Sequence, residues 1–169
     1  GAVHHGFCDV ALLRVLPGAA LTAAIDEPSL QAAMEFMRGY DDGLSMVRYP
    51  RDSVSPRLAG QACPPFVLGK ARCLTPALDV LNGGRVPDVA VLAFGTPAIA
   101  ALDAADAVKG DMDVGVWDAR FAKPVDRELL RTLLTRGVPV VTVEDHGVTG
   151  GFGAAILEAA AELGLDASN

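Results

Sequence analysis

The sequence VAVLAFGTPAIAALDAADAVKGDMDVGVWDA, residues 89–119, decides the fold class of this chain. Its first six residues, 89–94, form a continuous apolar run, which is typical of a buried strand. Thr96 and Pro97 then predict the start of a helix, because a hydroxyl side chain caps free N–H groups and proline is tolerated in a first helical turn. A second apolar run over 113–119 predicts another strand. This order indicates two parallel strands joined by a helical crossover.

The same alternation continues along the chain. Asp126 is expected to cap a helix with leucines on one face, and PVVTVED, residues 139–145, predicts a third strand. GGFG, residues 150–153, precedes a last predicted helix that runs to about Leu163. This loop lacks a lysine and the full spacing of a phosphate-binding loop, so close packing of the helix start on the sheet is the favoured interpretation. The sequence therefore predicts an α/β fold with a mainly parallel sheet.

The first third of the chain has its own helix and strand signals. Asp26-Glu27-Pro28 predicts a helix start, with Gly39 as its end, and LSMVRYPR, residues 44–51, predicts a strand. Residues 7–16 fit either a buried strand or a short helix. Four apolar residues at helical spacing predict the buried helix face: Leu30, Ala33, Met34 and Met37.

A proline-rich segment divides the chain into two parts. Residues 52–65 contain three prolines and no periodicity, which indicates a linker between domains. The following FVLGKARCL, residues 66–74, is expected to be a strand. DARFAKPVD, residues 118–126, reads as a loop whose last aspartate caps the next helix.

Composition limits the partners of this chain. At 169 residues and 51% hydrophobic, it is large enough for one good core or two small ones. The net charge of −7 argues against nucleic acid or an anionic membrane surface as a partner. Three cysteines without CxxC spacing argue against a zinc site and a disulfide framework, and favour a reducing compartment. Because the first residues already read as the inside of a domain, we expect a piece of a longer protein.

Three groups of polar residues are candidate functional sites. His4 and His5 precede a glycine, and an imidazole at a cleft edge could donate to a substrate oxygen or move a proton, although plain loop polarity is an equal alternative. Arg48 and Arg51 lie at a predicted strand end, where an arginine binds phosphate or carboxylate well, although a solvated strand end is more common. Residues 144–146, Glu-Asp-His, could form an acid/base cluster or an ordinary solvated loop.

Several strings taken together are more specific than any one of them. They occur in this order: HHG-x-x-D at 4–9, LR-x-x-PG at 13–18, VRYPR at 47–51, LAFGT at 92–96, D-x-RF-x-KP-x-D at 118–126, and VTVED followed by GGFG at 141–153. On these motifs the chain resembles the 1-deoxy-D-xylulose-5-phosphate synthase family, of the thiamine-diphosphate-dependent transketolase group. The resemblance covers essentially the whole chain and is poorest over residues 75–88.

The resemblance implies both the domains and the reaction. Residues 1–57 would be the end of a pyrimidine-binding domain, 58–65 a linker, and 66–169 most of a transketolase C-terminal-type domain. The implied reaction removes carbon dioxide from pyruvate and joins the two-carbon unit to D-glyceraldehyde 3-phosphate, for isoprenoid precursor, thiamine and pyridoxal biosynthesis. Thiamine diphosphate and Mg²⁺ would be held mainly by residues upstream of residue 1, so that this fragment alone would be inactive.

The resemblance also implies residue roles and a setting. His4 matches the family's active-site histidine, which contacts substrate oxygens, and Arg51 matches an arginine that grips the acceptor phosphate. Arg48 and Tyr49 would then be scaffold, and the role of His5 stays open. Val3 stands where threonine is usual in the family. A cytoplasmic homodimer is implied, with no nucleic-acid or membrane partner.

Two other function classes remain open from the sequence. One is another thiamine enzyme, either a transketolase or the β-subunit of a 2-oxoacid dehydrogenase, in which Arg51 would have no obvious role. The other is a non-catalytic α/β module for dimerisation or anion binding. This last class predicts that loss of His4 or Arg51 leaves turnover unchanged.

Overall fold

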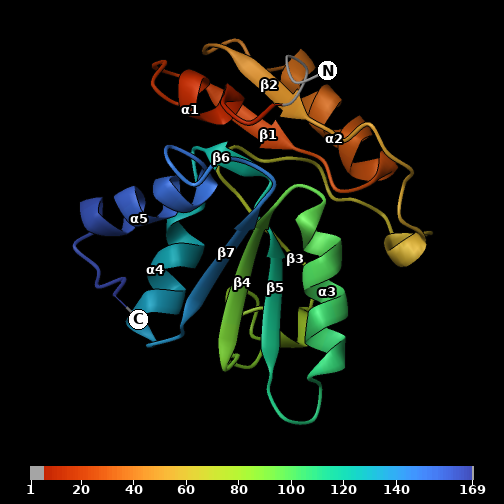
Figure 1. The fold of residues 1–169 in the computed structure, drawn as a ribbon, viewed down its shortest axis with the longest axis vertical. Helices are drawn as coiled ribbons and strands as arrows, with labels where there is room; N and C mark the ends of the chain where they lie inside the picture. The colour runs from red at the N-terminus through yellow and green to blue at the C-terminus, as the bar shows by residue number, and fades with distance from the viewer. Residues whose placement is uncertain (1–5, 169) are drawn as a thin grey trace.

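The computed structural model describes residues 6–168, which form two sheets (Figure 1). The first sheet has the strand order β2-β1-β6. Its strands β1 (Ala20–Ala23) and β2 (Ser45–Arg48) are parallel. Strand β6 (Phe121–Lys123) pairs with β1 in the antiparallel direction, although about 100 residues separate the two strands in the chain.

The second sheet is mainly parallel, as the sequence predicts. Its order is β3-β5-β4-β7, in which β4 (Val89–Phe94) lies between and parallel to β5 (Val114–Asp118) and β7 (Val140–Glu144). Figure 1 shows α3 (Pro97–Ala107) on one face, and α4 (Arg127–Thr135) and α5 (Phe152–Glu162) on the other. The short β3 (Arg72–Cys73) adds an antiparallel edge to β5. The α/β fold class is confirmed.

Helix starts follow the capping signals of the sequence. The Asp26 side chain accepts from the Ser29 amide, and the Ser29 hydroxyl oxygen accepts from the Asp26 amide, so both free N–H groups at the start of α2 (Glu27–Arg38) are satisfied. The predicted buried face of α2 is wrong at Met34, whose side chain is 59% exposed. The helix instead buries Ser29, whose hydroxyl oxygen accepts from the Ile25 and Asp26 amides, and Ala33.

Two segments differ from the sequence predictions, and a third decides between two alternatives. Residues 118–126 include strand β6, not only a loop, and Phe121 in this strand is fully buried. Of the strand predicted over 66–74, only Arg72–Cys73 is extended and paired, since the residues before it form a turn. Residues 7–16 contain a short helix, α1 (Asp9–Leu13), which decides between the two alternatives given above.

The proline-rich segment is attached to the second sheet layer and is not free. It contains a short 3-10 helix, η2 (Pro56–Leu58), in which Leu58 is buried. Arg57 pairs with Asp103 and Asp106 on the exposed side of α3. A second 3-10 helix, η3 (Pro76–Leu78), lies before β4. The division at 58–65 stays a prediction, although β6 already connects residues on both sides of it.

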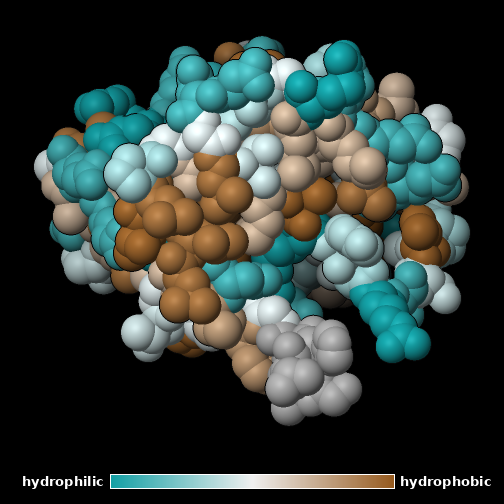
Figure 2. All heavy atoms as spheres, turned by 90° about the horizontal axis from the view of Figure 1, so that it is seen from above, coloured by the Kyte–Doolittle hydropathy of each residue, from teal (hydrophilic) through white to brown (hydrophobic). Residues whose placement is uncertain are grey.

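The surface near the first sheet is unusually apolar. Figure 2, seen from above, shows apolar side chains gathered into a patch on this end of the molecule. The short α1 and the segment after it contribute Leu12, which is 65% exposed, and Val15, which is 76% exposed. Surfaces of this kind often mark contacts with other protein segments. Within residues 6–168, no helix has both the length and the apolar character needed to cross a bilayer.

Candidate functional site

The carboxyl ends of strands from both sheets meet in the middle of the molecule. A small hollow of about 60 Å³ lies there, lined by Ala23 at the end of β1, Arg48 at the end of β2 with Tyr49 after it, Gly95 after β4 and Asp145 after β7. Beside it is a cavity of about 370 Å³, lined by residues of α2, the 49–55 segment and the start of α3. Ligands in α/β proteins bind at the carboxyl ends of parallel strands, so this is the candidate site.

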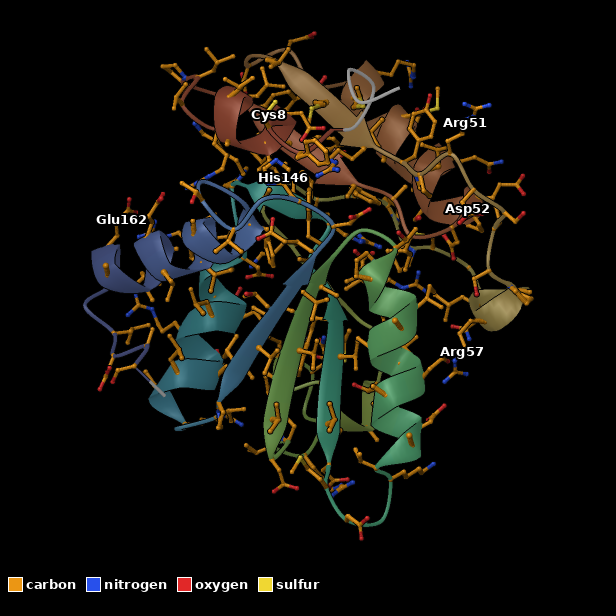
Figure 3. All side chains as sticks on the ribbon, viewed as in Figure 1. Cys8, Arg51, Asp52, Arg57, His146 and Glu162 are labelled. Atoms are coloured by element: carbon orange, nitrogen blue, oxygen red, sulfur yellow. The ribbon has the colours of Figure 1, made fainter. Side chains whose placement is uncertain are left out.

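Arg51 lies at the edge of this region. Its neighbours Pro50 and Asp52 line the larger cavity, and the arginine side chain is exposed (Figure 3). Among residues 6–168 no hydrogen bond or ion pair is made by its guanidinium, which leaves all five N–H donors available. The other two predicted site residues, His4 and His5, lie outside the described residues.

Arg48 is used internally, unlike Arg51. Its Nε lies 3.4 Å from Oδ2 of Asp9, and its Nη2 donates to the carbonyl oxygen of Asp145 at 3.0 Å. These contacts tie the end of β2 to the start of α1 and to the loop after β7. They agree with a scaffold role for Arg48.

His146 lies at the same junction (Figure 3). Its side chain is fully buried, with Nε2 at 3.3 Å from Oδ1 of Asp9 and Nδ1 at 3.8 Å from Oε2 of Glu144. Sequence analysis selected residues 144–146 but not Asp9, which lies 137 positions away in the chain. Within the loop after β7 the His146 side chain is therefore buried among carboxylates, whereas Asp145 and Val148 on either side of it are exposed.

The glycine-rich loop before α5 binds a carboxylate of this chain. Glu144 accepts the amides of Phe152 at 2.7 Å and Gly153 at 2.8 Å, and so caps the helix N-terminus. A Cβ on Gly151 would lie 2.5 Å from Oε2 of Glu144 and 2.4 Å from the Gly147 carbonyl oxygen. The glycines thus permit close packing of the helix start on β7, as the sequence favoured.

A second buried charge cluster holds the proline-rich segment. Asp118 and Arg120 are 0% and 3% exposed, with Nε of Arg120 3.8 Å from Oδ2 of Asp118. Burial raises the pKa of Asp118 to about 7, although Arg120 beside it acts in the opposite direction. The Arg120 guanidinium donates to the carbonyl oxygens of Pro64 and Pro65, each at 3.0 Å, and lies over the ring of Phe66. Arg120 of the D-x-RF string therefore holds residues 64–66 of the proline-rich segment in place. The sequence analysis did not predict this role.

Metal-ligating side chains do not gather in the described part of the chain. Within residues 6–168 there is no group of three or more His, Cys, Asp or Glu side chains that could hold a metal ion.

The fold and the position of the site define an α/β domain of the transketolase class, and comparison with known proteins agrees. The family model described as transketolase, C-terminal domain, matches residues 82–168. The chain belongs to the transketolase C-terminal domain family.

The particular resemblance given by the motifs is also confirmed. The chain is 41% identical over 167 residues to a 1-deoxy-D-xylulose-5-phosphate synthase of Gloeobacter violaceus, covering 98% of this chain and 25% of that protein. It is 41% identical over 165 residues to the synthase of Thermus thermophilus, covering 98% of this chain and 24% of the relative. The chain therefore spans about a quarter of the length of these curated relatives.

Two solved structures are similar to the whole chain. One is described as a split-gene transketolase, an inactive beta4 tetramer, with a TM-score of 0.77 at 30% identity, covering 96% of this chain and 50% of that one. The other is a transketolase from Leishmania mexicana, with a TM-score of 0.63 at 20% identity, covering 89% of this chain and 22% of that one. The second similarity shows the fold alone.

Proposed function

We propose that this chain is the C-terminal portion of a 1-deoxy-D-xylulose-5-phosphate synthase. The observation that carries the proposal is the 41% identity to two such synthases over 98% of the chain. In the proposed reaction the bond between the carboxylate and the carbonyl carbon of pyruvate breaks and carbon dioxide leaves. The remaining two-carbon unit forms a new carbon–carbon bond with the aldehyde carbon of D-glyceraldehyde 3-phosphate. The product would serve isoprenoid precursor, thiamine and pyridoxal biosynthesis.

Thiamine diphosphate with Mg²⁺ is the proposed cofactor, held by residues outside this chain. When bound, it supplies the nucleophilic carbon that makes decarboxylation of a 2-oxo acid possible. This chain would contribute the acceptor side of the site and is proposed to be inactive without the cofactor-binding part.

Arg51 is the proposed ligand of the acceptor phosphate. An arginine offers a planar fork of donors that matches phosphate oxygens. Support comes from its exposed side chain next to the cavity, which has no partner among residues 6–168, and from the contacts of Arg48 three residues earlier. Pro50 restricts the backbone of Tyr49, between the two arginines, to extended conformations.

His4 is the proposed catalytic residue, acting on the substrate oxygens. An imidazole there donates a hydrogen bond to the oxygen on which negative charge develops, or moves a proton near neutral pH. Support comes from the match of the HHG-x-x-D string to the family, and from the position of Asp9 of that string at the candidate site.

The proposed assembly is a homodimer in the cytoplasm, with pyruvate and D-glyceraldehyde 3-phosphate as small-molecule partners. The exposed apolar side chains of α1 and of the segment after it, Leu12 and Val15, support association, since contiguous apolar surface favours burial against another protein segment.

The experiment uses the full-length protein whose reading frame contains this chain, with thiamine diphosphate and Mg²⁺. Formation of a five-carbon 1-deoxyketose phosphate and release of carbon dioxide are measured with pyruvate, with and without D-glyceraldehyde 3-phosphate. The proposal predicts product only with both substrates. Transfer from a ketose phosphate without carbon dioxide release would instead indicate a transketolase, decarboxylation independent of the aldehyde would indicate a 2-oxoacid dehydrogenase component, and no turnover would favour a binding module.

A further inference from the structure

We propose that His146 is a positioning residue of the acceptor site, an inference that rests on the proposed function. It does not contact the substrate. It contacts Asp9, and through Asp9 it positions Arg48 at the end of β2, three residues before Arg51.

The contacts of His146 connect three separate segments of the chain. Its imidazole is fully buried between Asp9, at the start of α1, and Glu144, at the end of β7. Asp9 in turn lies 3.4 Å from Nε of Arg48, at the end of β2, and Arg48 donates to the carbonyl oxygen of Asp145. These contacts connect the loop after β7 both to the start of α1 and to the end of β2.

Among these segments, the end of β7 has the most firmly fixed position. Glu144 is 11% exposed and bonded to two amides of α5, so its position is set by the helix and not by the site. Asp9 and Arg48 are 31% and 21% exposed, and their positions depend on charge contacts more than on packing. His146 therefore links Glu144, whose position is set by α5, to Asp9 and Arg48, whose positions are less constrained.

Gly6, the first described residue of the chain, lies against the same contacts. A Cβ on Gly6 would lie 2.5 Å from Oδ2 of Asp9 and 3.4 Å from Nη2 of Arg48. A larger residue at position 6 would therefore require the Asp9 carboxylate to shift.

The two imidazole nitrogens have different tasks, and this makes the inference testable. Nδ1 lies 3.0 Å from the carbonyl oxygen of Gly147, which only accepts, so Nδ1 carries hydrogen in this contact. Nε2 is the imidazole nitrogen that faces Asp9, at 3.3 Å from Oδ1, and it makes no hydrogen bond within residues 6–168. Glutamine places an N–H₂ group near the position of Nε2, whereas asparagine places one near Nδ1 only.

The experiment compares His146→Gln and His146→Asn in the full-length protein with thiamine diphosphate and Mg²⁺. The readout is the ratio of kcat/KM for D-glyceraldehyde 3-phosphate to kcat/KM for D-glyceraldehyde, which reports the use of the acceptor phosphate. We expect H146N to lower this ratio about 10- to 100-fold, because small displacements of binding groups reduce rates by such factors. We expect H146Q to restore most of the ratio.

Controls separate positioning from loss of structure and from failure of the proposed function. Asp9→Asn keeps the side-chain shape but removes the charge that Nε2 and Arg48 face, so it should lower the same ratio even if H146N does not fold. A wild-type ratio in folded H146N, or an equal loss in H146Q and H146N, would overturn the positioning role while leaving the synthase reaction intact. A wild-type protein that forms no product from the two substrates would overturn the proposed function and this inference with it.

Discussion

Replacing Arg120 with lysine should destabilise the fold substantially although the charge is kept. The guanidinium makes two hydrogen bonds at 3.0 Å, to the carbonyl oxygens of Pro64 and Pro65, and its central carbon lies 4.4 Å from the centroid of the Phe66 ring. A lysine ammonium is a compact charge that can serve one carbonyl but cannot also span the second and stack on the ring. Arg120 has a φ of 57°, and lysine adopts this left-handed conformation no better and no worse, so backbone strain is unchanged.

The magnitude follows from the contacts that lysine loses. One hydrogen bond from a charged donor contributes about 1.5–3 kcal/mol, and a cation–π contact of this kind about 0.5–2 kcal/mol. The expected loss in the free energy of unfolding is therefore about 3 kcal/mol. For a chain of this length that corresponds to a fall in Tm of about 6–12 °C.

Urea unfolding followed by tryptophan fluorescence measures this directly. Trp117 is the single tryptophan of the chain, is 1% exposed and precedes Asp118 in the sequence, so its emission reports the unfolding of the core around it. Arg136→Lys is the matched control, because Arg136 is exposed and its side chain makes no contact with a partner among residues 6–168. The reasoning is refuted if R120K and R136K unfold at the same urea concentration.

Two further predictions concern buried carboxylates. Because burial raises the pKa of Asp118 from 3.8 in the unfolded chain to about 7, its contribution to stability is fully present below pH 3.8 and is lost as the pH rises through about 7. Asp118→Asn should flatten this part of the pH dependence of the urea midpoint, and an unchanged slope would contradict the assignment. Asp126→Ala removes the acceptor of the Leu129 and Ala71 amides, both at 3.0 Å, and should destabilise the chain by about 1–3 kcal/mol in thermal unfolding. The exposed control Asp111→Ala should change Tm by much less, and equal effects would show that the cap is unimportant.

Local signals in the sequence were sufficient for the main elements. Apolar runs of five or six residues predicted β4, β5 and β7, because buried parallel strands need no alternation. Asp26 and Asp126 predicted the starts of α2 and α4, and their side chains accept hydrogen bonds from first-turn amides. Helix α3 begins at Pro97 as predicted, although the Thr96 side chain makes no capping hydrogen bond. These patterns depend only on neighbouring residues.

Features that depend on distant residues could not be predicted in the same way. Strand β6 has three residues and no periodicity of its own, and its extended form depends on pairing with β1. The exposure of Met34 follows from which face of α2 meets the sheet, which helical spacing alone does not specify. The contacts of His146 with Asp9 and of Arg120 with the linker each join residues more than 50 positions apart. The sequence showed that these residues belong to motifs but not what they contact.

The most direct test of the central claim is the acceptor preference of Arg51→Ala in the full-length protein. Condensation of pyruvate with D-glyceraldehyde 3-phosphate and with D-glyceraldehyde is measured for wild type, R51A and the remote exposed control Arg136→Ala. Loss of a charged contact to phosphate should lower kcat/KM for the phosphorylated aldehyde about 10- to 100-fold and leave the unphosphorylated one nearly unchanged. Equal kinetics of R51A and R136A with both aldehydes would contradict the account.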